Sequence, residues 1–169
     1  MSKNKPVVLI GLMGSGKTSA GRLIAEALEL PFSDSDAFLK QRYGGTAAQL
    51  AERDGADALH RYEADHVLHQ LAGEPEVVAA AASTVEFPEV RAALRSAFVV
   101  WVDASDEVLA RRMKSSSHRP DFGPAAMRAR REPFFREVAD LRCDVGDMTP
   151  EQVRDATLRE MGLPEGDRH

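Results

Sequence analysis

Short apolar runs alternate along the chain with longer stretches in which apolar residues recur at helical spacing. Five such runs predict strands, at positions 7–10, 31–33, 76–80, 98–102 and 141–145. After the first run, apolar residues fall three or four positions apart and predict an amphipathic helix: Ala20, Leu23, Ile24, Ala27 and Leu28. Strands that alternate with helices predict an α/β fold, in which helices cover both faces of a five-stranded parallel sheet.

The rest of the chain divides into further helices, one loop and a tail. Helical segments are predicted within 37–72, over 107–113, around Arg128, Arg130 and Arg131, and over 150–161. The segment 114–124 is rich in serine, arginine, proline and glycine and has no apolar period, which predicts a mobile loop. From Gly162 the chain is polar, and we expect a disordered tail over 162–169. We found neither a repeat nor a linker, so residues 1–169 are predicted to form one domain.

Composition narrows the class of protein. The chain has 169 residues, of which 43% are hydrophobic and 29% charged, as is typical of one soluble globular domain. A net charge of −5 argues against sequence-independent binding of nucleic acid. The apolar runs are too short to span a membrane, and the polar start leaves no room for a signal peptide, so we expect a cytoplasmic protein with no membrane partner. Cys143 is the only cysteine, which excludes an intrachain disulfide.

A phosphate-binding loop, G-x-x-x-x-G-K-T, lies between the first predicted strand and the first predicted helix, at Gly11 to Thr18. Its glycines let consecutive backbone N–H groups converge on an anion, and the helix N-terminus adds its dipole. Lys17 could then reach the β- and γ-phosphates, and the Thr18 hydroxyl could bind Mg²⁺. The alternative is a chance glycine-rich turn, which both flanking elements disfavour. The sequence therefore predicts a nucleoside triphosphate site.

Acidic residues at the ends of two predicted strands are candidates for the same site. Asp34 and Asp36 follow the second strand, at the carboxyl edge where ligands bind in such sheets. Asp103 follows the fourth strand; it could help to hold Mg²⁺, but we favour a role as the cap of the following helix. The Asn-Lys pair Asn4-Lys5 precedes the loop, whereas GTPases carry a guanine-reading N-K-x-D element well after it, so that branch is disfavoured.

The chain resembles the shikimate kinases, small relatives of the nucleoside monophosphate kinases. The resemblance spans nearly the whole length and is carried by these motifs: the loop at 11–18, PFSDSD at 31–36, LHRYE at 59–63, VWVDAS at 100–105, HRP at 118–120 and REPFFREVAD at 131–140. It implies a three-layer P-loop kinase fold with a short lid at about 114–124. It also implies Mg²⁺- and ATP-dependent phosphoryl transfer to a hydroxyl of a small metabolite, by a protein that is commonly a monomer.

The resemblance also assigns roles to residues. Lys17, Asp36 and Arg119 would be catalytic, with Asp36 as base and Arg119 over the transferring phosphate. Thr18, and Asp34 through water, would hold Mg²⁺. The nucleotide would contact the loop and its neighbours: Gly11, Met13, Gly14, Ser15, Gly16, Lys17, Thr18, Ser19, Arg112 and Pro150. Two alternatives stay open: Asp36 as the N-cap of a helix in a solvated turn, and Arg112 as a solvated arginine.

Three departures from the family pattern fall on the acceptor side. The family holds a carboxylate between two arginines, of which Arg131 remains, whereas His60 replaces the other. Arg61 is adjacent to His60, but successive residues of a helix point about 100° apart, so Arg61 does not substitute for the missing arginine. The alternative is that His60 is a surface histidine with no role in binding. Ala81, Ala82 and Ser83 replace a glycine triplet, and we expect lost space and costly backbone angles there. The predicted lid is also short.

We therefore expect substrate contacts from Asp36, His60, Ala81, Ala82 and Arg131, and three functions stay open. The first is a kinase on this scaffold with an altered, less anionic acceptor, such as a polyol, cyclitol or sugar-like alcohol. The second is an authentic but divergent shikimate kinase. The third is a non-catalytic ATP-binding regulator, which the intact loop and Asp36 disfavour. Trp101 and Cys143 are expected to be core residues.

Overall fold

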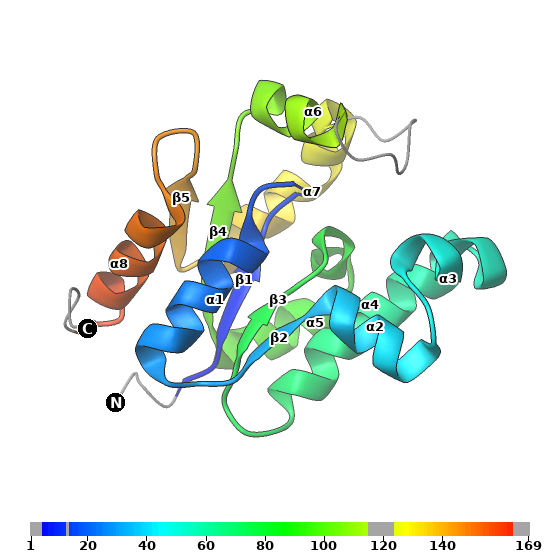
Figure 1. Cartoon of the computed structure of the whole chain (residues 1–169), viewed down its shortest axis with the longest axis horizontal. Coiled ribbons are helices and arrows are strands. Elements are labelled where there is room, and N and C mark those ends of the chain that lie inside the picture. The colour runs from blue at the N-terminus through cyan, green and yellow to red at the C-terminus, as the bar shows by residue number, and fades with distance from the viewer. Residues whose placement is uncertain (1–4, 13, 115–123, 164–169) are drawn as a thin grey trace.

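Five strands form one parallel sheet in the order β2-β3-β1-β4-β5, as the computed structural model shows for residues 5–12, 14–114 and 124–163 (Figure 1). The strands are β1 (Val7–Ile10), β2 (Phe32–Asp34), β3 (Val77–Ala79), β4 (Phe98–Asp103) and β5 (Leu141–Asp144). Every predicted strand is present, with its ends shifted by at most one residue, and the predicted five-stranded parallel sheet is confirmed.

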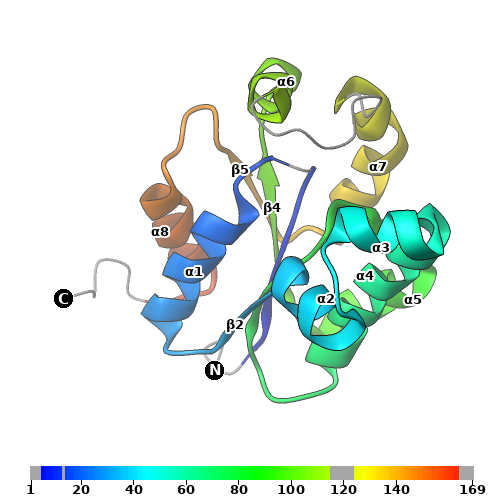
Figure 2. The same ribbon diagram turned by 45° about the vertical axis from the view of Figure 1, so that its right-hand side comes forward.

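Helices cover both faces of the sheet, as predicted (Figures 1 and 2). On one face lie α1 (Lys17–Leu28) and α8 (Pro150–Glu160); on the other lie α4 (Ala56–Leu71), α5 (Pro88–Ala93), α6 (Asp106–Lys114) and α7 (Pro124–Val138). The cause is the two-residue period of a strand, which turns successive side chains to opposite faces. In β1, Val7 and Leu9 join the core under α1 and α8, whereas Val8 and Ile10 join the core under α4 and α7.

Two further helices extend the molecule beside β2. α2 (Ser35–Tyr43) and α3 (Ala47–Asp54) pack with α4 around a small apolar cluster of Leu39, Leu50 and Leu59. The sequence did not predict the region after β3, where η2 (Ala82–Glu86, a 3-10 helix), α5 and η3 (Leu94–Ser96) form a compact connection. None of the helices in the described ranges has the length and apolar character needed to cross a lipid bilayer.

The phosphate loop follows β1, the central strand, at the edge of the sheet where the order of the strands reverses. This is the place at which open α/β sheets bind ligands. Gly11 has a φ of 148°, and a side-chain carbon built on it would lie 2.3 Å from the Val102 carbonyl oxygen. Gly16 also has a left-handed φ, 101°, directly before α1 begins. Glycine is thus required for the loop to lie against β4 and to turn into the helix.

Two sequence predictions on irregular segments need correction. The predicted disordered tail begins too early, because Gly162 and Leu163 close α8: the Leu163 N–H donates to the Leu158 carbonyl at 2.8 Å. Residues 164–169 lie outside the described residues. Likewise, the predicted loop 114–124 overlaps two helices, since Lys114 ends α6 and Pro124 begins α7. The rest of that segment, including the predicted lid, lies outside the described residues.

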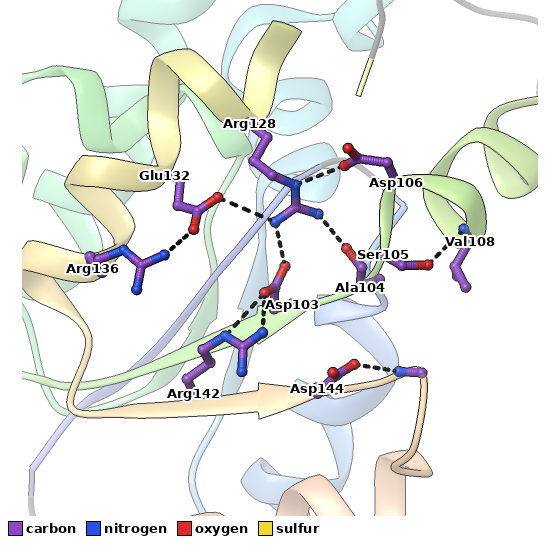
Figure 3. Close-up of polar contacts among 11 residues, drawn as sticks. Asp103, Ala104, Ser105, Asp106, Val108, Arg128, Glu132, Arg136, Arg142 and Asp144 are labelled. Carbon is purple, nitrogen blue, oxygen red and sulfur yellow. Dashed lines mark hydrogen bonds and ion pairs between the residues drawn. The ribbon is translucent and has the colours of Figure 1, made fainter. Parts of the chain in front are cut away.

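Asp103 has a role that we did not predict (Figure 3). It does not cap α6, because the Ser105 hydroxyl accepts the Val108 N–H there at 3.2 Å. The Asp103 carboxylate instead accepts from Arg128 of α7 at 2.9 Å and from Arg142 of β5 at 2.7 Å. The favoured prediction, that Asp103 caps the following helix, is therefore wrong. The alternative role in holding Mg²⁺ gains no support, because arginines engage both of its carboxylate oxygens. The contacts fix α7 against the end of β4, and α7 carries Arg131 one turn further on.

Candidate active site

One cavity of about 310 Å³ gathers most of the residues that the sequence pointed to. Six segments meet there: the phosphate loop with the start of α1, the end of β2 with α2, the start of α3, one side of α4, the end of β3 with η2, and α7. The predicted site residues that line it are Gly14, Gly16, Lys17, Thr18, Ser19, Asp34, Asp36, His60, Ala81, Ala82 and Arg131. The donor and acceptor halves that the sequence predicts therefore face one space.

Lys17 is held inside the phosphate loop itself. Its Nζ donates to the Gly11 carbonyl at 2.6 Å and to the Leu12 carbonyl at 3.3 Å. Burial and, to a smaller extent, the nearby charge of Arg131 together lower the pKa of Lys17 to about 8, although Glu63 and Asp36 act in the opposite direction. A buried cation beside a second cation is a favourable place for an anion, because phosphate oxygens would compensate both charges.

Asp34 and Asp36 lie at the junction of β2 and α2, where the sequence placed them. Asp34 is the N-cap of α2, since its Oδ1 accepts the Ala37 N–H at 3.0 Å. The alternative in which Asp36 is the cap is therefore wrong. Asp36 lies in the first turn of α2, is exposed and lines the cavity. Its carboxylate is thus available to a ligand without loss of the helix cap.

Two buried hydroxyl oxygens at the site find no hydrogen-bond partner within the described ranges. One is the Oγ of Ser15, in the phosphate loop, and the other is the Oγ of Ser35, between the two aspartates. Buried polar groups are normally paired, and unpaired ones need an explanation such as a ligand or water. The unpaired hydroxyls, together with the loop that only glycine can form at Gly11, fit a polar, anionic ligand such as the phosphates of a nucleotide.

A second cavity, of about 360 Å³, lies on the other side of the phosphate loop. It shares Gly14, Gly16 and Ser19 with the first cavity. Its other lining residues come from the loop and α1 (Ser15 and Ala20), from the segment between β5 and α8 (Val145 and Met148) and from α8 (Pro150 and Val153). Pro150 is thus beside the loop, as expected for a residue that borders a nucleotide base. Arg112 lies in α6, and its side chain is not described; Met13 and Arg119 lie outside the described residues.

The acceptor side contains carboxylates that the sequence analysis did not single out. Glu63 of α4 is buried and accepts from the Ser83 hydroxyl at 2.8 Å. One sequence pattern could have indicated it: Glu63 lies four positions after Leu59, which puts both residues on the same, buried side of α4. Glu86 contacts Arg131 at 2.6 Å, and no sequence pattern marked it. Arg131 is only 4% exposed and lines the cavity, and its contact with the acceptor stays a prediction.

The replacement of the family's glycines has a smaller backbone consequence than expected. Ala81 has φ −64° and ψ 150°, an ordinary extended conformation. Within the described ranges Glu29 is the only residue other than glycine with a positive φ. The expected backbone strain at Ala81, Ala82 and Ser83 is therefore wrong, because this chain forms η2 with conformations open to any residue. The expected loss of space remains a prediction.

A buried histidine of α4 forms a hydrogen bond with a serine of β2. His66 of α4 is fully buried, its Nε2 lies 2.8 Å from the Ser33 hydroxyl, and its Nδ1 has no partner in the described part of the chain. Burial lowers the pKa of His66 to about 4, although nearby Asp34 favours the protonated form. The ring is therefore neutral at pH 7. The sequence did not reveal this residue, because a histidine within a helical segment gives no indication of whether it is buried.

His66 should make the protein less stable in mild acid. Its pKa is lower in the folded chain than the ordinary 6.5, so the unfolded chain binds more protons between pH 6.5 and 4, and stability falls as the pH falls through that window. Between pH 7.5 and 5 the loss is about 2 kcal/mol. Urea unfolding at both pH values would measure it. His66→Gln should flatten the slope, and His69→Gln, at an exposed site, should not; equal slopes in all three proteins would contradict the assignment.

Comparisons of sequence and of structure with known proteins all identify shikimate kinases as similar to this chain. The family model described as shikimate kinase matches residues 13–162. Shikimate kinases of Symbiobacterium thermophilum and Mycobacterium tuberculosis are 39% and 35% identical to the chain; the first match covers 80% of the chain and 84% of its relative, and the second 93% of each. A solved structure, the shikimate kinase from Acinetobacter baumannii in complex with shikimate, superposes with a TM-score of 0.80 at 24% identity, covering 92% of this chain and 89% of that one. The predicted P-loop kinase fold is confirmed.

Proposed function

The chain belongs to the shikimate kinase family, and on that premise we propose that it phosphorylates a hydroxyl of a small acceptor less anionic than shikimate. That it is an ATP-dependent small-molecule kinase follows from the family. The observation that carries the proposal is the cavity shared by Lys17, Thr18, Asp36 and Arg131, which joins a phosphate site to an acidic acceptor site. We further propose that residues 1–169 act as one kinase domain.

The donor half is proposed to hold MgATP. The phosphates would lie in the loop against Lys17, with the base toward Pro150 in the second cavity. Thr18 would ligate Mg²⁺, and Asp34 would contact it through water; Mg²⁺ would neutralise charge on the β- and γ-phosphates. Among the described residues no cluster of three His, Cys, Asp or Glu side chains could form a metal cage. This agrees with an ion held largely by phosphate oxygens and water.

The proposed transfer is a direct, in-line displacement. The acceptor oxygen forms a bond to the γ-phosphorus, and the bond from that phosphorus to the β,γ-bridging oxygen breaks, so that ADP leaves. Asp36 would orient the acceptor hydroxyl and receive its proton. Lys17 would stabilise the charge that grows on the phosphoryl oxygens, and Arg119 is proposed to assist it.

The charges around the acceptor support a less anionic substrate. Three carboxylates line the cavity, those of Asp34, Asp36 and Glu63, against two cations, Lys17 and Arg131. Since Lys17 is assigned to phosphate, Arg131 is the remaining cation among the described lining residues that could meet an acceptor carboxylate. His60 lines the cavity where the family has an arginine, and an imidazole cannot form the bidentate contact that a guanidinium makes with a carboxylate. A polyol, cyclitol or sugar-like alcohol would suit this balance.

Shikimate itself is the second candidate. A buried arginine that lines the cavity is a natural partner for the carboxylate of that acid, and the relatives of this chain carry its name. The two candidates share the donor half and the base and differ only in the charge of the acceptor. The third function raised by the sequence, a non-catalytic regulator, is not favoured by any contact described above.

The test is a coupled assay of ADP release from MgATP with shikimate and with a panel of uncharged cyclitols and sugars. We expect one or more uncharged acceptors to give a kcat/KM at least tenfold above that of shikimate, because each unpaired buried charge is costly in a site of low dielectric. If shikimate is the best acceptor, the kinase proposal stands but the altered acceptor is refuted. If ATP binds and no acceptor accelerates ADP release, the kinase proposal itself fails.

A further inference from the structure

Glu86 bridges two arginines beside the acceptor cavity. It is the last residue of η2; its Oε2 lies 2.6 Å from the Nε of Arg131, and its Oε1 lies 3.0 Å from the Nε of Arg130. The two contacts differ in their shielding from solvent. The Arg130 side chain is 65% exposed, whereas those of Arg131 and Glu86 are 5% and 21% exposed. Exposed pairs contribute little, so the contact with Arg131 is the one that matters electrostatically.

The fold of η2 explains why Glu86 is near the acceptor. A 3-10 helix has three residues per turn, so side chains three positions apart lie on the same side. Ser83 and Glu86 are such a pair: Ser83 lines the acceptor cavity and donates to Glu63, and Glu86 contacts Arg131 one turn later. Both also line an adjoining hollow of about 400 Å³, together with His60. Glu86 therefore lies close enough to the acceptor for its charge to be felt.

The contact changes what Arg131 can offer to a ligand. A guanidinium binds a carboxylate best through two parallel N–H groups, and one such edge includes Nε. In this chain Nε of Arg131 already donates to Glu86. A carboxylate ligand would have to bind beside an acidic group already paired to the same cation. In a shielded site, that repulsion opposes most of the attraction that Arg131 would supply.

We propose that Glu86 is a specificity-determining residue that compensates the charge of Arg131 and lowers affinity for acceptors that carry a carboxylate. The inference rests on the proposed function, because it names the chemical class that the acceptor site disfavours. Arg131 then serves neutral acceptors as a hydrogen-bond donor rather than as the counter-ion of an acid. The charge at position 86 decides whether Arg131 acts as a hydrogen-bond donor to a neutral acceptor or as the counter-ion of a carboxylate.

The experiment compares two probes that differ in charge, shikimate and its methyl ester, bound in the presence of MgADP and measured by calorimetry. In the Glu86→Gln variant an amide oxygen can still accept from Arg131, but the negative charge is gone. We expect this variant to bind shikimate about tenfold more tightly and to change the affinity for the ester by less than about twofold. Because each probe is its own reference, the difference in size between acid and ester cancels.

The matched control is Glu89→Gln, which removes the same charge from a surface pair with Arg61, 3.0 Å apart and 48% exposed on each side. It should alter neither affinity, which excludes a general effect of net charge. Glu86→Ala, which removes the acceptor oxygen too, should shift the acid-to-ester ratio in the same direction. Thermal melting of each variant would verify that it is folded.

Three results would overturn the inference: weaker shikimate binding by Glu86→Gln, an equal change for acid and ester, or undetectable shikimate binding in every variant. The first would make Glu86 a residue that orients Arg131 for a carboxylate. The readout is binding, so it does not depend on turnover. Failure of the kinase proposal would appear separately, as ADP release that no acceptor accelerates.

Discussion

Replacing Lys17 with methionine should reduce acceptor-dependent ADP release by about a thousandfold while the protein stays folded. Phosphoryl transfer depends almost entirely on positioning and on stabilisation of charge, so the loss of one well-placed cation is costly. Methionine has a similar length and no charge. In the free protein Lys17 donates to the Gly11 and Leu12 carbonyls, and its burial beside Arg131 already disfavours the charged form. Removing that charge should therefore cost little stability.

The measurement is kcat from the coupled assay, with the melting temperature as a test of folding. Lys40→Met is the matched control: Lys40 is exposed in the last turn of α2, it does not line the cavity, and its loss should leave kcat unchanged. Lys17→Arg keeps the charge on a larger, planar group and should recover only part of the rate. A Lys17→Met protein that retained more than a tenth of the wild-type kcat would contradict the assigned role.

The sequence could predict the sheet because its signals are local. Each strand is a short apolar run, and the alternation of strand and helix leaves a parallel sheet with both faces covered as the simplest arrangement. In the segment after β3, local signals do not predict the structure. Ala79 to Ala82 continue an apolar run, so the predicted strand extended one residue past Ala79, where β3 ends, and η2 has no period long enough to detect.

The site residues, too, could be predicted only where the signal in the sequence is local. The phosphate loop, Asp34 and Asp36 could be located because each follows a strand that ends at the same edge of the sheet. The pairings could not: Arg131 and Glu86 lie 45 positions apart, and Arg142 and Asp103 lie 39 apart. Only the packing of α7 and β5 brings these groups together. A sequence names candidate charges, but it does not show which of them compensate one another.

Replacing Asp36 with asparagine should lower kcat by between about a hundredfold and ten thousandfold, the usual contribution of a general base. Asparagine has the same shape and can still hydrogen-bond an acceptor hydroxyl, but it cannot take up the proton. The helix cap should survive, because Asp34 rather than Asp36 accepts the Ala37 N–H. The affinity for MgATP should change little, because Lys17 and the loop are assigned to the phosphates.

The kinetic pattern separates a base from a positioning group. Loss of the base should lower kcat with an acceptor KM that changes only a few-fold, whereas loss of a positioning contact alone should raise KM with kcat retained. Glu89→Gln is the control, because Glu89 also lies in the first turn of a helix, α5, but does not line the cavity. A kcat within a few-fold of wild type in Asp36→Asn would exclude Asp36 as the base. Glu63, a buried carboxylate in the same cavity that already accepts from Ser83, would then be the group to test, and Glu63→Gln should abolish turnover in its place.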